Sequence, residues 1–168
     1  MEIRVVGPEE FEQLGWITVA AYRHLHGDAP LGDYEVQLRA VSARAADSVV
    51  LVAVDDAGDL LGGVTYVPDS GRAMSEFSDP EAAGIRMLAV RPDRQGTGVG
   101  RALTEECIRR ARSDGRPRVV LHSTDVMVVA RRMYERMGFV EAPELDVYLG
   151  ERPYAKEGLR LIAFVLAL

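Results

Sequence analysis

The chain has 168 residues, of which 48% are hydrophobic and 27% are charged, and its formal net charge at pH 7 is −6. This length and composition predict one globular domain spanning residues 1–168. Nucleic-acid-binding domains are normally basic and membrane spans need ~20 apolar residues, so no nucleic-acid or membrane partner is expected. The N-terminus lacks the basic and then apolar layout of a secretory signal, which predicts a cytoplasmic protein.

The single cysteine, Cys107, excludes an internal disulfide framework. Its position on the apolar side of a predicted helix indicates a small core residue rather than a nucleophile. The sequence contains no Cys and His spacing typical of zinc sites, so no metal is expected.

The N-terminal half predicts a strand, two helices and a hairpin. An alternating segment indicates a strand at 2–6, and a proline followed by a broad apolar face indicates a helix at 8–24. A second helix is predicted at 33–44. The apolar runs 49–54 and 60–67 flank a turn rich in aspartate and glycine, so their short connection makes them an antiparallel hairpin.

Residues 68–83 contain four acidic residues but few large apolar ones, so we expect a long loop there. Loops of this length are more often functional or mobile than idle. The acidic residues stand shortly before the next predicted strand and are Asp69, Glu76, Asp79 and Glu81.

The next segment predicts a strand, a glycine loop and a helix in direct succession. The apolar run 85–90 ends near Pro92, which lacks the amide that a strand ladder needs. Gly96, Gly98 and Gly100 follow, and an apolar helical repeat begins there. Glycines let a ligand approach the backbone, and the first amides of a helix have no intrahelical acceptor. The loop therefore predicts a phosphate site.

Two common phosphate loops do not match this pattern. A Walker loop needs Lys and then Ser or Thr after its last glycine, whereas Arg101 and Ala102 follow Gly100. A dinucleotide fingerprint needs Gly or Ala three residues after its second glycine, where this chain has Arg101 or Leu103. Both interpretations are disfavoured.

The C-terminal part predicts a strand at 118–122 and a helix at 126–137 that stops at a glycine. Two strands that are each followed by a helix indicate a local βαβ arrangement with parallel neighbours. Another strand begins at 139–142, and the apolar run 159–168 predicts a strand that closes the sheet. For 143–158, strand and loop both remain open.

Two motifs resemble those of the GCN5-related N-acetyltransferases, the GNAT superfamily. Gln95-Gly96-Thr97-Gly98-Val99-Gly100 resembles the Gln/Arg-x-x-Gly-x-Gly/Ala signature, and Met87-Leu88-Ala89-Val90-Arg91-Pro92 resembles the strand and proline before it. Ala130-Arg131-Arg132-Met133-Tyr134-Glu135-Arg136-Met137-Gly138-Phe139 resembles the second motif. The resemblance implies an α/β fold with a mixed, mostly antiparallel sheet, flanked by helices and splayed between the strands near 85–90 and 118–122.

The resemblance also implies an acetyl-CoA-dependent N-acetyltransferase. The acceptor would be a primary amine of a small molecule, or secondarily of a protein or peptide, and it would attack the thioester directly. Loop amides would hold the pyrophosphate of coenzyme A, and the strand before the loop would pair with the pantetheine arm. The residues implied to bind acetyl-CoA are Leu88, Ala89, Val90, Arg94, Gln95, Gly96, Thr97, Gly98, Val99, Gly100 and Arg101.

Catalytic roles follow from the same matching. Tyr134 stands where many members keep a general acid near the sulfur, and a phenol is protonated at neutral pH. The backbone amide of Leu88 would face the thioester oxygen. Gly84 stands where some members carry a glutamate base, so Glu81 is assigned this role instead.

Glu76, Asp79 and His122, acting through water, are alternatives to Glu81. Met127 stands where the family's second helix often has an asparagine. Because the base is uncertain and this asparagine is missing, a catalytically silent acyl-CoA-binding module is the alternative function.

In the family, the connection between the first two helices often borders the acceptor pocket. Tyr22, His24, His26 and Tyr34 are therefore candidates for the wall of that pocket. The final apolar strand presents an edge through which two copies could form a homodimer.

Overall fold

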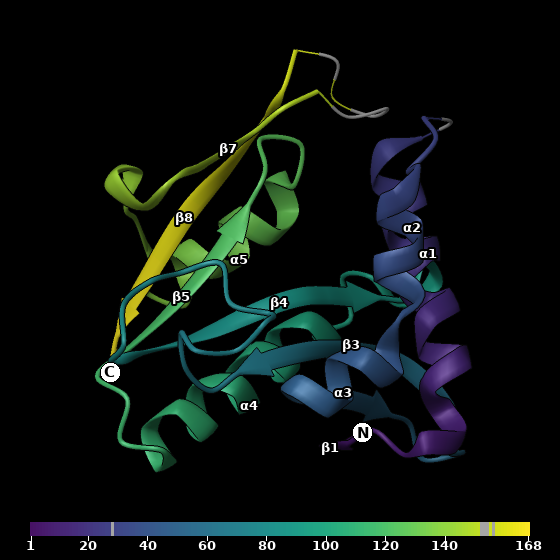
Figure 1. Cartoon of the computed structure of the whole chain (residues 1–168). Coiled ribbons are helices and arrows are strands. Elements are labelled where there is room, and N and C mark those ends of the chain that lie inside the picture. Colours follow the sequence, from purple (N-terminus) through teal and green to yellow (C-terminus); the bar gives the residue numbers. More distant parts are fainter. Residues whose placement is uncertain (28, 152–154, 156) are drawn as a thin grey trace.

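The computed structural model describes residues 1–27, 29–151, 155 and 157–168, which form one eight-stranded sheet with helices on both faces (Figure 1). The strand order is β1-β2-β3-β4-β5-β8-β6, and β7 pairs with β8 outside this path. The strands are β1 (Glu2–Val5), β2 (Val49–Val54), β3 (Leu60–Val67), β4 (Ala82–Val90), β5 (Arg118–Ser123), β6 (Val140–Glu141), β7 (Val147–Leu149) and β8 (Leu159–Ala167). The helices are α1 (Phe11–His26), α2 (Asp33–Arg39), α3 (Val41–Asp47), α4 (Val99–Ser113) and α5 (Val128–Arg136), with 3-10 turns η1 (Pro8–Glu10), η2 (Pro92–Arg94) and η3 (Pro143–Leu145).

The sheet is antiparallel except where β4 meets β5. Their parallel pairing starts at Ala82 opposite Arg118 and ends at Ile85 opposite Leu121, although β4 continues to Val90. The two strands therefore separate halfway along β4, and Figure 1 shows them diverging. This arrangement confirms the predicted mixed, mostly antiparallel and splayed sheet.

The apolar run of β2 is continuous because both faces of the sheet are buried. Successive side chains of a strand point to opposite faces. Val52 packs in one cluster with Leu14 of α1 and with α3. Leu51 packs in the other with Leu103 of α4. Cys107 of α4 is fully buried in this second cluster, where burial raises the pKa of its thiol, so the structure confirms it as a core residue.

Several predicted elements have different boundaries in the structure. The single helix predicted at 33–44 is wrong: it is two helices, which break at Ala40, where ψ is 56°. Leu38 and Val41 are both buried across the break, so the apolar spacing continues through it and could not reveal it. The predicted helix at 8–24 begins as the 3-10 turn η1 and extends to His26.

The central strand starts three residues earlier than predicted, at Ala82. The sequence did not indicate this start because the first residues are small and have low strand propensity. In the open segment 143–158, the structure has η3 and β7, while 152–154 and 156 lie outside the described residues. The predicted strand at 139–142 is reduced to β6. In the described part of the chain, no helix has the length and apolarity needed to cross a membrane.

Candidate functional site

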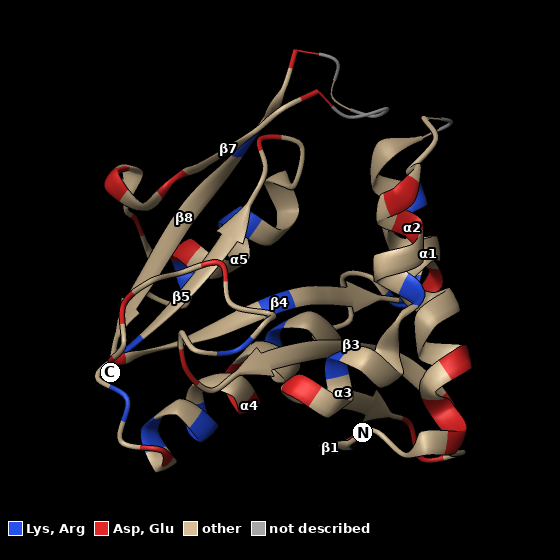
Figure 2. Ribbon diagram, viewed as in Figure 1, with Lys and Arg blue, Asp and Glu red and all other residues tan. Residues whose placement is uncertain are grey.

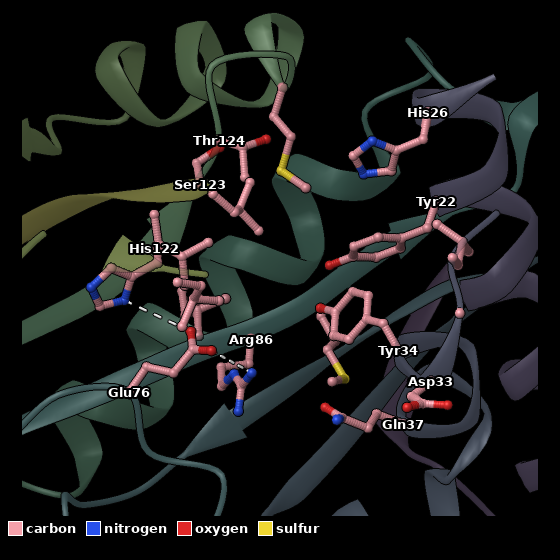
Figure 3. Close-up of a pocket in the computed structure, with 18 of the residues that line it drawn as sticks. Tyr22, His26, Asp33, Tyr34, Gln37, Glu76, Arg86, His122, Ser123 and Thr124 are labelled. Carbon is pink, nitrogen blue, oxygen red and sulfur yellow. Dashed lines mark ion pairs between the residues drawn. The ribbon is translucent and has the colours of Figure 1, made fainter. Parts of the chain in front are cut away.

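The point where β4 and β5 separate is bridged by a carboxylate. Arg86 and His122 are the residues that directly follow the last paired positions of the two strands. Glu76, from the loop before β4, lies between them, with one carboxylate oxygen 2.5 Å from Arg86 Nη2 and the other 3.8 Å from His122 Nδ1 (Figure 3). Arg86 is the one charged residue of β4 and appears as its blue segment in Figure 2. The point where β4 and β5 separate, which we call the sheet opening, thus carries a carboxylate, a guanidinium and an imidazole group.

His122 is oriented by its second ring nitrogen. Its Nε2 lies 3.1 Å from the carbonyl oxygen of Leu145, and a carbonyl only accepts, so Nε2 carries the proton. In the neutral ring, Nδ1 then keeps its lone pair and faces the Glu76 carboxylate. Two acceptors that face each other across 3.8 Å form a place where a proton donor, such as an ammonium group or water, can bind between them.

A cavity of about 650 Å³ opens at this point. Figure 3 shows Tyr22 of α1 and Tyr34 of α2 directed toward the Glu76 side from the opposite wall. Their rings meet edge to face, with centroids 5.7 Å apart, and burial raises the pKa of both phenols. The cavity is lined by Tyr22, His26, Leu31, Gly32, Asp33, Tyr34, Gln37, Glu76, Ile85, Arg86, Met87, His122, Ser123, Thr124, Met127, Leu149, Glu151, Leu159 and Leu161.

Three of the four residues expected in an acceptor wall line this cavity. Tyr22, His26 and Tyr34 do so, whereas His24 is exposed on α1 and does not. On a helix, residues 22 and 26 are one turn apart and share a face, and residue 24 points elsewhere. Helical spacing alone could therefore have removed His24 from the set.

A β-bulge shapes the floor of the cavity. Gly63 pairs with Ala89 and Thr65 with Arg86, so Met87 and Leu88 together oppose a single residue of β3. Met87 has φ 51°, a left-handed conformation that no other non-glycine residue adopts among those the structure describes. The bulge takes the backbone next to Leu88 out of the regular ladder beside the cavity.

The glycine loop leads directly into α4. Gly96 and Gly98 have φ of 77° and 91°, and a Cβ at either position would meet no atom within 4 Å. The first helical bond runs from the Ala102 amide to the Gly98 carbonyl. The amides of Val99, Gly100 and Arg101 therefore have no acceptor within the helix. This open cradle of amides suits a phosphate group.

Gly100 has a different role from the other two glycines. Its φ is not in the left-handed region, and a Cβ would make ordinary contacts with Val90 and Met133. Around the loop, Gln95 and Thr97 are exposed, and the Thr97 hydroxyl donates to the Arg94 carbonyl at 2.6 Å. Only two of the three glycines are thus required by backbone conformation.

Two exposed arginines flank the loop. Arg101 pairs with Glu105 at 2.8 Å, and Arg94 Nε lies 3.7 Å from Asp93. Exposed pairs of this kind contribute little to stability, so either side chain can turn toward an anion at small cost.

Tyr134 lies in the core next to the cavity rather than in its wall. It is 6% exposed and packs against Phe139 and Phe164, with ring centroids 5.7 and 6.2 Å away. Burial raises the pKa of its phenol, so the hydroxyl stays protonated near neutral pH. It belongs to the same buried cluster as Ile85, which lines the cavity.

Glu81 lies outside the cavity. Its side chain is 67% exposed and pairs with Arg118 at 3.1 Å, and Asp79 also bonds Arg118. These two acids hold the start of β5, whereas Glu76 is 28% exposed and lines the cavity. The sequence offered several acids in one loop and no signal to choose among them.

Phe77 occupies the space beside Gly84. A Cβ built on Gly84 would collide with the Phe77 ring, so the strand accepts only glycine there while the ring stays in place. We expect Gly84→Ala to destabilise the protein by ~1–3 kcal/mol, because the ring must move. Urea unfolding measures this loss. Activity should fall as well, because Glu76 directly precedes Phe77 in the chain and would move with it.

Phe77→Leu in the Gly84→Ala background provides the control. The smaller side chain should restore part of the lost stability. A Gly84→Ala variant as stable as the parent would contradict the packing argument.

Among the residues that the structure describes, no three His, Cys, Asp or Glu side chains gather in a way that could hold a metal ion.

Comparisons with known proteins agree with this geometry. The sequence profile described as "Acetyltransferase (GNAT) family" matches residues 11–139. A mycothiol acetyltransferase of Cellulomonas flavigena is 36% identical over 97 residues, which are 57% of this chain and 28% of the relative. An uncharacterized N-acetyltransferase of Schizosaccharomyces pombe is 32% identical over 91 residues, which are 54% of this chain and 51% of the relative. The chain spans about a fifth to a third of the length of the mycothiol acetyltransferases that it matches.

Solved structures share the fold. The putative acetyltransferase yncA of Salmonella typhimurium, solved with acetyl-CoA, has a TM-score of 0.70 at 22% identity, covering 100% of this chain and 94% of its own. A ribosomal-protein-alanine N-acetyltransferase of Brucella melitensis has a TM-score of 0.72 at 20% identity and full coverage of both chains. At these identities the likeness establishes the fold.

Proposed function

Because this chain belongs to the GNAT family of acetyltransferases, we propose that it transfers an acetyl group from acetyl-CoA to a primary amine of a small molecule. The main observation behind the proposal is the cavity at the sheet opening, where Glu76 and His122 lie opposite Tyr22 and Tyr34. The relatives named mycothiol acetyltransferases support a small-molecule acceptor. Acetyl-CoA supplies the acetyl group as a thioester.

The glycine loop and the free edge of β4 would hold acetyl-CoA. The amides at the start of α4 provide donors for its diphosphate, and Arg94 and Arg101 add positive charge beside them. Beyond Ile85, the edge of β4 that faced β5 is no longer paired. Leu88, Ala89 and Val90 on this edge could bind the pantetheine arm as an added strand, and the Leu88 amide would face the thioester oxygen.

We assign the general base to Glu76, together with His122, in place of Glu81. The substrate ammonium would donate to the carboxylate and to Nδ1 of His122, and one of its protons would leave to Glu76 directly or through water. The amine nitrogen then bonds to the acetyl carbon while the carbon–sulfur bond breaks, and the nitrogen loses a second proton that returns through water to Tyr134. Tyr134 would donate a proton to the departing thiolate, since its buried phenol stays protonated.

Tyr134→Phe tests the assigned acid. The change removes only the hydroxyl, and the ring keeps its contacts with Phe139 and Phe164. We expect kcat to fall by about 10²-fold with little change in the melting temperature, because a positioned acid contributes roughly 10²–10⁴-fold. A variant that retains full kcat would remove this role from Tyr134.

The proposal as a whole is tested by incubating the protein with acetyl-CoA and a panel of amines and detecting product by mass spectrometry. The panel should contain small amines and a peptide with an N-terminal alanine, which represents the protein acceptor. Acetylated small amines are expected. If coenzyme A raises the melting temperature but no panel member is acetylated, the silent acyl-CoA-binding module would be the better interpretation.

A further inference from the structure

Arg44 is a positive charge buried under the cavity, and no carboxylate of the described residues pairs with it. It is 3% exposed and forms the blue segment of α3 in Figure 2. Its Nη2 donates to the Leu38 carbonyl and its Nη1 approaches the Met87 sulfur, each at 3.1 Å, while its Nε has no partner. No Asp or Glu in the described ranges forms an ion pair with it.

This burial is unfavourable for the fold. A thioether is a weak acceptor, and a buried charge without an opposite charge loses hydration that its contacts do not replace. Burial accordingly lowers the pKa of Arg44 to about 10. An apolar side chain of the same length would pack in this position at a lower cost in free energy. The presence of a charge here therefore indicates a function other than core packing.

Arg44 is separated from the cavity by one side chain. Met87, which its guanidinium contacts, lines the cavity and belongs to the bulge that precedes Leu88. The charged and titratable groups that interact with Arg44 are Tyr22 from α1, Tyr34 from α2 and Arg86 from β4. Glu76 pairs with Arg86, whereas Arg44 beneath the floor has no such carboxylate among the residues that the structure describes.

We propose that Arg44 is a positioning residue that serves the reaction from behind Met87, and that its charge keeps the acceptor amine neutral and polarises the thioester carbonyl. A nearby positive charge disfavours the ammonium form of an amine, and the attacking amine must be neutral. The same charge favours the negative charge that develops on the carbonyl oxygen during attack. This inference rests on the proposed function, which supplies the amine and the thioester.

The first test compares Arg44→Met, which removes the charge but keeps the length, with Arg44→Lys, which keeps the charge. In Arg44→Met, the acidic limb of the kcat/KM profile should move up by about one pH unit, because the bound ammonium loses its repelling neighbour. The value at pH 7 should then fall about tenfold. Arg44→Lys should keep the limb near its original position. An unchanged limb in Arg44→Met would overturn the proposal.

A second test does not depend on turnover. The carbonyl resonance of [1-¹³C]acetyl-CoA, measured by NMR, should shift downfield on binding to the parent protein. The shift should be smaller with Arg44→Met and preserved with Arg44→Lys. Equal shifts in all three proteins would contradict the polarising role. If acetyl-CoA does not bind the parent, the proposed function fails; if it binds and the variants behave alike, only the role of Arg44 fails.

Stability separates this role from a structural one. Replacing a buried, unpaired charge by an apolar group should leave the free energy of unfolding unchanged or higher, so Arg44→Met should lose activity without losing stability. A large loss of stability would instead assign Arg44 to the fold. Arg44→Gln, which can still bond the Leu38 carbonyl, must shift the acidic limb as Arg44→Met does; if it does not, the charge is not the cause.

Discussion

Gly98→Ala should weaken the binding of acetyl-CoA by about ten- to a hundredfold. Gly98 has φ 91° at the start of α4, and a Cβ there projects into open space beside the free amides. A methyl group in this space obstructs the diphosphate, and relief of the left-handed strain turns the amides away from it. The loss of one charge-assisted hydrogen bond costs about 1.5–3 kcal/mol, which sets the expected range. Isothermal titration with coenzyme A measures the effect.

Gly58→Ala is a matched control. Gly58 lies in the turn between β2 and β3, has the same φ of 91°, and also has no atom within 4 Å of a built Cβ. Both variants should lose a similar stability of ~1–2 kcal/mol from strain alone. Only Gly98→Ala should lose coenzyme A affinity. Equal affinity in the two variants would refute the diphosphate site.

Glu76→Gln should lower kcat/KM by about 10²-fold or more. The substitution keeps the size of the side chain but removes the proton acceptor and the charge between Arg86 and His122. A positioned general base contributes roughly 10²–10⁴-fold. The pH–rate profile and the Kd for acetyl-CoA should be measured together, because loss of the base lowers turnover but leaves coenzyme binding intact.

Glu81→Gln provides the comparison for this prediction. Glu81 comes from the same loop, but its side chain pairs with Arg118 outside the cavity. It should retain parental kcat/KM within about twofold, since exposed ion pairs contribute little. If Glu81→Gln is the inactive variant and Glu76→Gln remains active, the sequence-based assignment of the base is restored and ours fails.

Much of the fold could be predicted because its signals are local. The apolar runs of β2 and β3, the proline after β4 and the glycine at the end of α5 each indicate an element by their own chemistry. The resemblance to the GNAT family, carried by the glycine loop and the second motif, is confirmed by the profile match over residues 11–139. The errors lie where local signals are silent, as at Ala40, where the apolar spacing continues across a helix break.

Of the proposed site, the sequence indicated the glycine loop but not the arrangement of the cavity. Gly96 and Gly98 are consecutive in the motif, and their role follows from backbone freedom at the start of a helix. The acceptor half is assembled from α1, α2, the loop before β4, and β5, which are distant in sequence. The choice of Glu76 over Glu81 depends on which acid of that loop points toward the sheet opening. The two acids are close in sequence, so sequence position does not distinguish them.

By itself, the sequence determined the order of most elements, the glycine loop and the family, because these depend on side-chain periodicity and on the backbone preferences of single residues. Only the tertiary structure decided that Glu76 bridges Arg86 and His122, that Met87 adopts φ 51°, and that Arg44 lies beneath it with no carboxylate partner in the described part of the chain. The reason is physical. Periodicity reports which face of an element is buried, whereas the free energy of a charge depends on every group around it, and those groups meet only when the sheet and its helices pack together.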